Sequence, residues 1–195
     1  MAKIAGYITL ICMLSCIIRN QPVSSDRDIS YNVAVDTIET SQVNIRDKVI
    51  DTLLSYLHVK ELTGNNDGPE VEMFIASTGL DPKAGHPWCA AFISYIFQAN
   101  SLSVPRYSAR AAAWFDEDHI ISNKNAIKAD LGSLYYARLG RIGHIVMYLQ
   151  PYDNPTPYVA VGEGNTNAQL SNEGNRAAKN FRPRAVIHSS ANWID

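Results

Sequence analysis

The segment from Cys89 to Asn100, CAAFISYIFQAN, restricts the fold of this chain more than any other part of the sequence. Its side chains are apolar almost all the way round a helix, whereas a helix on a protein surface carries a polar face. A helix of this kind has to be covered on every side. We therefore expect it at the centre of a domain, with Cys89 at its start.

Further helices are expected on both sides of this central helix. Apolar side chains at helical spacing predict an amphipathic helix from Asn44 to Leu62, and a glycine follows as a stop signal. A turn over Asn65 to Gly68 leads into a short helix from Pro69 to Gly79, since proline is favoured at the first helical position. Ser108 is a candidate cap for a last helix that runs through Phe115.

The second half of the chain has the pattern of β-strands. Short runs rich in Val, Ile and Tyr are separated by Gly, Pro, Asn and Asp, which favours antiparallel strands joined by turns. These runs are Ser133 to Leu139, His144 to Gln150, Tyr158 to Gly162 and Ala185 to His188. Helices followed by strands predict an α+β fold, in which N-terminal helices pack on one side of a small antiparallel sheet.

The N-terminus has the form of an export signal. Met-Ala-Lys supplies a positive charge, and the apolar run from Ile4 to Ile18 that follows is short for a membrane-spanning helix. Leu14-Ser15-Cys16 resembles the lipobox of bacterial lipoproteins, with Met13 where that pattern usually has Leu. The resemblance implies a lipid anchor on Cys16. The alternative is that Cys16 is a small apolar residue within the signal.

The 195 residues suit one domain behind such a signal. The part of the chain that follows the signal is polar and aperiodic, as in a flexible linker. We expect a signal over residues 1–16, a linker over 17–43 and a folded domain over 44–195. With 17 basic and 19 acidic residues the formal charge is −2, so nothing in the composition points to nucleic acid as a partner.

Three cysteines are present, at positions 12, 16 and 89, and the first two fall inside the export signal. The domain therefore keeps one thiol and cannot form an internal disulfide. Cys89 is either a buried small apolar residue or a reactive group. A helix start favours reactivity, because the positive end of the dipole and the unpaired N–H groups stabilise a thiolate and an oxyanion. Position alone leaves both interpretations open.

A nucleophilic thiol needs a proton acceptor, and histidine titrates near neutral pH. The five histidines are at positions 58, 86, 119, 144 and 188. A surface position is the simplest interpretation for the first three. His144 instead opens an apolar strand after a turn that begins and ends with glycine, Gly140 to Gly143. A side chain at such a position can project into a cleft at the edge of the sheet, so His144 is the candidate base.

A third group orients the imidazole in sites of this type, and carboxylates and amides fill that role. Glu163 and Asn165 follow the predicted strand from Tyr158 to Gly162. Residues two apart on an extended segment face the same side, so both side chains can point at one site if the strand continues. The alternative is a polar turn at the end of the strand.

Four segments together resemble the CHAP branch of the NlpC/P60 superfamily. They are Asn65 to Val71 (NNDGPEV), Pro87 to Ser94 (PWCAAFIS), Gly143 to Val146 (GHIV) and Glu163 to Asn167 (EGNTN). Trp-Cys-Ala at a helix start is the most specific of them, and their order strengthens the match. The resemblance covers roughly residues 45–187.

The resemblance implies a papain-like α+β fold in which a helix-start cysteine meets a strand histidine. It also implies hydrolysis of an amide bond in peptidoglycan, by an N-acetylmuramoyl-L-alanine amidase or a peptide endopeptidase. Cys89 would match the nucleophile and His144 its base. Glu163 would match the acidic residue that orients the base, and Asn165 the amide that accompanies it. No cofactor or metal is expected, since the lone thiol and scattered histidines lack the ligand spacing of a zinc site.

Two places depart from the family pattern. Ile145 to Met147 lacks the glycine that often follows the histidine. Asp130-Leu131-Gly132 replaces the usual Gly-Asp before the first strand, which leaves the entry to that strand open.

A substrate groove is expected beside Cys89. Trp88 is a candidate wall of this groove, with a core aromatic as the alternative. Tyr107, Arg110 and Trp114 are candidates for its lining, and Arg110 for binding a stem-peptide carboxylate. The alternative for these three residues is ordinary packing with a solvated face.

Three functions remain open at this stage. The first, which the resemblance favours, is peptidoglycan hydrolysis by an exported monomer in the cell envelope. The second is a catalytically inactive wall-binding or scaffold protein with the same fold. The third directs the same thiol chemistry at proteins, as a peptidase or acyltransferase. The four site residues occur together, which disfavours the second function because an inactive site is free to lose any of them.

Overall fold

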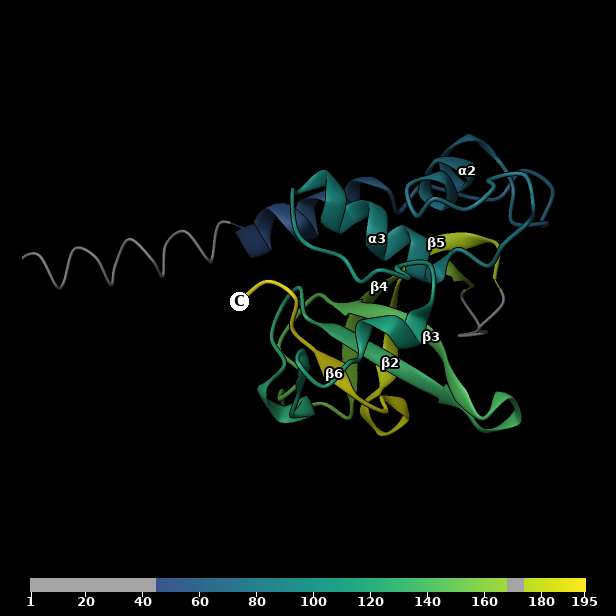
Figure 1. The fold of residues 1–195 in the computed structure, drawn as a ribbon. Coiled ribbons are helices and arrows are strands. Elements are labelled where there is room, and N and C mark those ends of the chain that lie inside the picture. The colour runs from purple at the N-terminus through teal and green to yellow at the C-terminus, as the bar shows by residue number, and fades with distance from the viewer. Residues whose placement is uncertain (1–44, 168–173) are drawn as a thin grey trace, which may run out of the picture. The chain divides into compact units, whose positions relative to one another are not determined.

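Three α-helices and a six-stranded antiparallel sheet make up the computed structural model, which describes residues 45–167 and 174–195. Figure 1 shows the helices gathered on one side of the sheet. The expected α+β architecture is confirmed. The signal expected over residues 1–16, with Cys16, and the linker expected over 17–43 lie outside the described residues. Within the described ranges, no helix is both long enough and apolar enough to cross a membrane.

The sheet has the strand order β1-β6-β2-β3-β4-β5, and each neighbouring pair is antiparallel. Its strands are β1 (Ile120–Ile121), β2 (Leu131–Tyr136), β3 (Arg141–Tyr148), β4 (Tyr158–Thr166), β5 (Arg176–Pro183) and β6 (Ser190–Ala191). β3 and β4 are interior strands, and the central helix packs against both of them.

The central helix is α3 (Cys89–Ala99), as its composition predicts. Every residue from Cys89 to Phe97 except Tyr95 is buried. The sheet covers one side of this helix, and α2 (Pro69–Ala76) packs against another through Phe74, whose ring lies edge-on to Phe92. Cover on several sides explains why α3 has no polar face.

The first helix ends earlier than its apolar pattern predicts. Residues 45–55 are helical, whereas the expected end was Leu62. Beyond residue 55 the chain turns, and Lys60 forms an isolated antiparallel bridge with Arg176 at the start of β5. Pairing with a strand replaces the helical hydrogen bonds that this segment would otherwise make.

Two other segments differ from the expectation. Ser108 does not cap a helix, because its hydroxyl bonds to the Ser94 hydroxyl at 2.9 Å and only the short 3-10 turn η1 (Ala111–Trp114) follows. The strand expected at Ala185 to His188 is not formed: its first two residues belong to the 3-10 turn η4 (Arg184–Val186), and the next two are in neither a helix nor a strand. The strand before it, β5, is one that no apolar run predicts.

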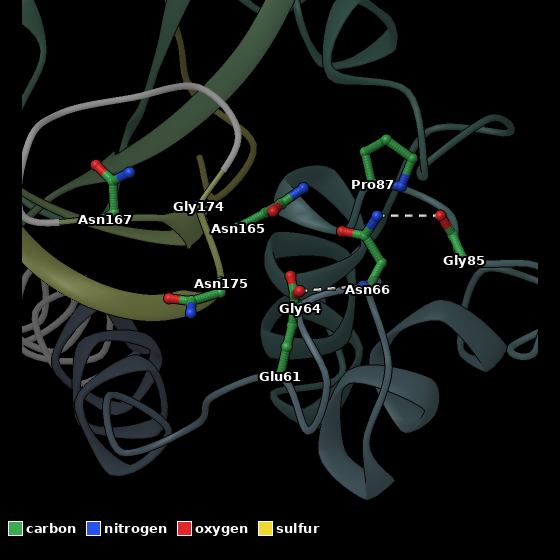
Figure 2. Close-up of a pocket in the computed structure, with 9 residues that line it drawn as sticks. All are labelled: Glu61, Gly64, Asn66, Gly85, Pro87, Asn165, Asn167, Gly174 and Asn175. Carbon is green, nitrogen blue, oxygen red and sulfur yellow. Dashed lines mark hydrogen bonds between the residues drawn. The ribbon is translucent and has the colours of Figure 1, made fainter.

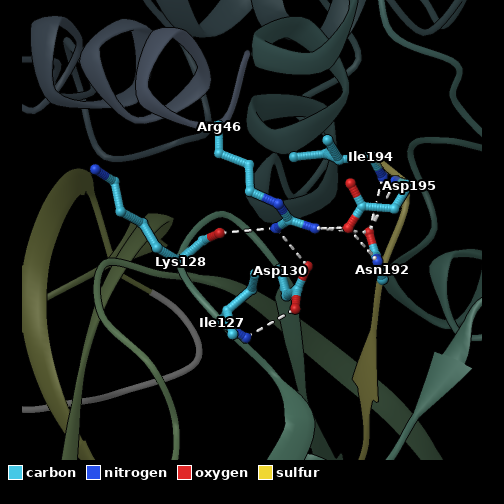
Figure 3. Close-up of polar contacts among 7 residues, drawn as sticks. All are labelled: Arg46, Ile127, Lys128, Asp130, Asn192, Ile194 and Asp195. Atoms are coloured by element: carbon cyan, nitrogen blue, oxygen red, sulfur yellow. Dashed lines mark hydrogen bonds and ion pairs between the residues drawn. The ribbon is translucent and has the colours of Figure 1, made fainter. Parts of the chain in front are cut away.

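The C-terminus is fixed to the first helix through Arg46. The Arg46 guanidinium forms ion pairs with Asp130, at 2.8 Å, and with Asp195. It also donates to the Lys128 carbonyl and to the side-chain oxygen of Asn192, as Figure 3 shows. Because Asp130 directly precedes β2, this buried pair determines how the chain enters that strand.

Candidate active site

Cys89 is the first residue of α3, and Trp88 is the N-cap residue. The side chain of Trp88 makes no capping hydrogen bond, and N–H groups in the first turn of a helix have no acceptor within the helix. Cys89 is 8% exposed and borders a groove of about 490 Å³. The thiol therefore lies at the positive end of the helix dipole, where a ligand in the groove can reach it.

His144 lies on β3, and its side chain is completely buried. Its Nε2 atom bonds to Glu163 Oε2 at 2.5 Å. Its Nδ1 atom has no hydrogen-bond partner of ordinary geometry among the described residues. The Cys89 thiol is nevertheless close enough to raise the proton affinity of the ring. Since Nε2 is occupied, Nδ1 is the nitrogen that is left to exchange a proton with Cys89.

Opposing effects set the pKa of His144. Burial by itself lowers it, because the protonated ring loses its hydration. Hydrogen bonding to Cys89 and to Glu163, together with the negative charges of both groups, raises the pKa of His144 to about 9. His144 is therefore an imidazolium at neutral pH, and its charge stabilises negative charge on the nearby sulfur.

Glu163 on β4 holds the opposite side of the His144 ring, and its side chain is also completely buried. Its Oε1 atom accepts from Arg182 Nε at 3.0 Å and from Asn180 Nδ2 at 2.8 Å, while Oε2 accepts from Arg182 Nη2 at 2.7 Å. Burial by itself raises the pKa of Glu163, but the bonds and charges of His144 and Arg182 lower it to about 2. Glu163 therefore stays ionised and fixes the ring of His144.

Asn180 and Arg182 are site residues that the apolar patterns of the sequence do not reveal. Both lie on β5 with buried side chains, whereas Phe181 between them is 58% exposed. Polar residues that face inward on either side of an outward aromatic reverse the usual strand pattern. The two-residue spacing of Asn180 and Arg182, after a strand that contains a glutamate, is the signal that could have identified them.

Two glycines allow the elements of the site to approach closely. A Cβ atom on Gly164 would lie 2.7 Å from the Trp88 ring and 2.8 Å from Phe92 Cβ. Strand β4 can therefore lie directly against the first turns of α3. A Cβ atom on Gly143 would collide with the ring of Tyr136. Close packing thus explains why glycine occupies these positions in the Gly-His and Glu-Gly-Asn motifs.

Asn165 lies close to the start of α3. With its amide oriented to satisfy both groups, its oxygen accepts the Trp88 backbone N–H at 3.3 Å and its nitrogen donates to the Gly174 carbonyl at 2.5 Å. No hydrogen bond joins Asn165 to His144 in the described part of the chain. Figure 2 shows Asn165 at a second cavity, of about 670 Å³. Its contacts favour support of the helix start, and its expected catalytic role stays a prediction.

The turn from Asn65 to Gly68 holds the loop that precedes Cys89. Asn66 donates its side-chain amide to the Gly85 carbonyl at 3.1 Å and its backbone N–H to Glu61 Oε2 at 3.0 Å (Figure 2). The other oxygen of Glu61 accepts the indole N–H of Trp88 at 2.8 Å. This motif of the sequence therefore positions the residues that lead into the nucleophile.

Two of the four residues expected to line the substrate groove are buried. Trp88 and Trp114 belong to the hydrophobic core with no exposed surface, so the expectation that they form groove walls is wrong. Both rings are covered by aromatic neighbours. Arg110 is exposed and does line the groove of Cys89. Tyr107, which is 56% exposed, lines a smaller adjacent cavity of about 130 Å³ that Arg110 also borders.

Neither the search for a metal site nor the comparison with known proteins assigns a function to further residues. Within residues 45–167 and 174–195, no group of His, Cys, Asp and Glu side chains has the arrangement of a metal site. Comparisons with protein-family models, with curated proteins and with solved structures find no match for this chain. The functional conclusion therefore depends on the geometry of Cys89, His144 and Glu163.

Proposed function

We propose that this protein is a cysteine hydrolase with a papain-like fold that cleaves an amide bond in peptidoglycan, as its resemblance to the CHAP branch of the NlpC/P60 superfamily implies. The observation that supports the chemistry is the buried His144 ring, which is bonded to Glu163 at one nitrogen and open toward Cys89 at the other. Export through the expected N-terminal signal, with a lipid anchor on Cys16, would bring the domain to the cell wall.

In the proposed reaction, the Cys89 thiolate adds to the carbonyl carbon of the scissile amide. The backbone N–H of Cys89 stabilises the negative charge that forms on the carbonyl oxygen. His144 gives its Nδ1 proton to the leaving amine nitrogen as the C–N bond breaks, which leaves a thioester on Cys89. His144 then takes a proton from a water molecule whose oxygen attacks the thioester. The C–S bond breaks, and the thiolate returns as the carboxylic product leaves.

The cost of burying these charges favours a catalytic role over a structural one. His144, Glu163 and Arg182 are almost completely removed from water. Apolar side chains of similar volume often stabilise a core as well as a buried ion pair or better. A scaffold protein has no use for this arrangement, whereas a thiol hydrolase requires it.

Digestion of purified peptidoglycan by the wild type and by Cys89→Ala tests the proposal. The substitution removes only the sulfur at a helix start where Ala90 and Ala91 follow, so the variant should fold. Mass spectrometry should detect fragments with the wild type alone. A newly exposed amine on L-alanine would identify an amidase, and a cut between stem-peptide residues would identify an endopeptidase.

An unfolded protein offered in parallel separates the two kinds of substrate. Cleavage of that protein but not of peptidoglycan, lost in Cys89→Ala, would redirect the same chemistry to a peptidase. The absence of any product that depends on Cys89 would contradict the enzyme proposal.

A further inference from the structure

The groove beside Cys89 is lined by basic side chains from three separate segments. Arg110 comes from the loop before η1, Arg141 from the start of β3 and His86 from the loop before α3. The described residues that line this groove include no Asp or Glu. Because the whole chain has a formal charge of −2, the positive character belongs to this groove and not to the protein in general.

Arg110 and Arg141 differ from the arginines that stabilise the fold. Arg46 and Arg182 form ion pairs with the buried carboxylates of Asp130 and Glu163. Arg110 and Arg141 are exposed, and neither forms an ion pair or side-chain hydrogen bond within the described ranges. Their guanidinium groups are therefore available to a ligand in the groove.

The buried charged residues behind Cys89 do not cancel the positive charge of Arg110 and Arg141 in the groove. The negative charge of ionised Glu163 is balanced by its ion pairs with His144 and Arg182, and all three side chains are buried. The only buried carboxylate behind Cys89 among these contacts, that of Glu163, is thus paired with two cationic partners. The charges of Arg110 and Arg141 consequently face the groove without compensation. A groove with walls of low dielectric constant concentrates the electric field of charges of one sign that line it.

We propose that this groove is an anion-binding subsite in which Arg110 and Arg141 hold a substrate carboxylate close to the scissile amide. A guanidinium group matches a carboxylate with two parallel hydrogen bonds, which gives orientation as well as charge recognition. The identity of the substrate rests on the proposed function. For peptidoglycan, the subsite favours stem peptides with free carboxylates over the same peptides with those carboxylates amidated.

Alkylation of Cys89 tests the subsite without any substrate. The full-length protein is treated at low salt with iodoacetate, which is anionic, and with neutral iodoacetamide, and the adduct on Cys89 is quantified by peptide mass spectrometry. The ratio of the two rate constants should fall about fivefold in the double variant Arg110→Met/Arg141→Met. Arg138→Met is the matched control, because Arg138 is exposed in η3 (Ala137–Leu139) but does not line the groove. An unchanged ratio in the double variant overturns the proposal.

Paired substrates test the chemical class. Soluble stem-peptide fragments that differ only in a free or amidated carboxylate should differ about fivefold in kcat/KM with the wild type and about equally with the double variant. Equal cleavage by the wild type overturns the carboxylate preference while the proposed hydrolase remains. If no fragment is cleaved, the proposed function fails and the alkylation ratio alone decides whether the anion subsite exists.

Discussion

At the scale of single residues, the ionised carboxylate of Glu163 couples His144 to Arg182. Its Oε2 atom contacts both His144 Nε2 and Arg182 Nη2. Because this oxygen accepts the proton-bearing Nε2, the other ring nitrogen is directed away from Glu163 and toward the thiol. An amide at position 163 would orient the ring as well, but it would not hold the charge of the imidazolium.

Replacing Glu163 with Gln should lower the pKa of His144 from about 9 toward its ordinary value of 6.5. The imidazolium donates the proton to the leaving amine, so activity disappears as pH rises through the pKa of His144. The alkaline limb of the rate profile should therefore move from about pH 9 toward neutrality. Initial rates across the pH range measure this shift, and an unmoved limb would show that Glu163 does not set the charge of His144.

The same pKa predicts how wild-type stability depends on pH. A histidine whose pKa is raised in the folded state adds stability that is fully present below its ordinary pKa of 6.5 and lost as pH rises through about 9. Urea unfolding midpoints of the wild type should therefore fall across this window by more than those of His144→Ala. Parallel curves for the two proteins would argue against a raised pKa.

Removing Arg182 should destabilise the domain. Arg182→Met leaves the Glu163 carboxylate buried without the two hydrogen bonds that Arg182 donates to it, and breaking a buried ion pair costs about 3 kcal/mol. Urea unfolding measures this cost. Arg182→Lys is the matched control, since it keeps the charge without the paired hydrogen bonds and should recover part of the stability. A cost below about 0.5 kcal/mol in Arg182→Met would contradict the assigned hydrogen bonds.

At the scale of elements, apolar periodicity predicts the structure well where burial is apolar. It identifies α3 and the strands β2 to β4, because their buried positions are filled by residues such as Phe92 and Ile145, whereas α2 is identified by the proline at its start. It fails at β5, whose inward positions are the polar Asn180 and Arg182. Because these inward residues are polar, the apolar pattern that predicts a strand is absent from β5.

Helix ends and connections depend on contacts between distant parts of the chain. Nothing local stops the first helix near residue 55, and the bridge from Lys60 to Arg176 joins positions far apart in sequence. Ser108 has the right residue type for a cap, but Ser94 competes for its hydroxyl. Trp88 and Trp114 show the same limit, because an aromatic beside a reactive residue can equally be a wall or part of the core.

The close approach of β4 and α3 predicts that Gly164→Ala is destabilising. The new methyl group would meet the fixed Trp88 ring and Phe92 Cβ, and overpacking of this kind costs about 1–3 kcal/mol. Gly143→Ala is the matched comparison, because the nearest atoms to its methyl group all belong to one half-buried side chain, Tyr136, rather than to two buried ones. Urea unfolding should show the larger loss of stability in Gly164→Ala. Equal losses would indicate that β4 can shift away from α3.

At the scale of the whole described domain, its first helix and its last residue together support the sheet. Arg46 from the first helix joins Asp130, at the entry to β2, to Asp195 at the C-terminus (Figure 3). Burial holds the pKa of Asp130 above its ordinary value even though Arg46 acts to lower it. This contact closes the domain around the strand that lies next to β3.

Arg46→Met should therefore reduce stability by about 3 kcal/mol, because it leaves the carboxylate of Asp130 buried without its ion-pair partner. Lys83→Met is the control, since it removes an ion pair with Glu72 in which the lysine is exposed, and such pairs contribute little. Chemical unfolding of both variants gives the comparison. Similar midpoints for the two would contradict a structural role for the Arg46 contacts.

The central claim is that Cys89, His144 and Glu163, from three different elements, form one proton-transfer unit. A nitrogen NMR titration of the His144 ring in the wild type and in Cys89→Ala tests it most directly. The wild-type ring should remain an imidazolium up to about pH 9, and its pKa should fall when the sulfur is removed. A wild-type ring that titrates near its ordinary pKa of 6.5, or one whose titration is the same in Cys89→Ala, would contradict the claim.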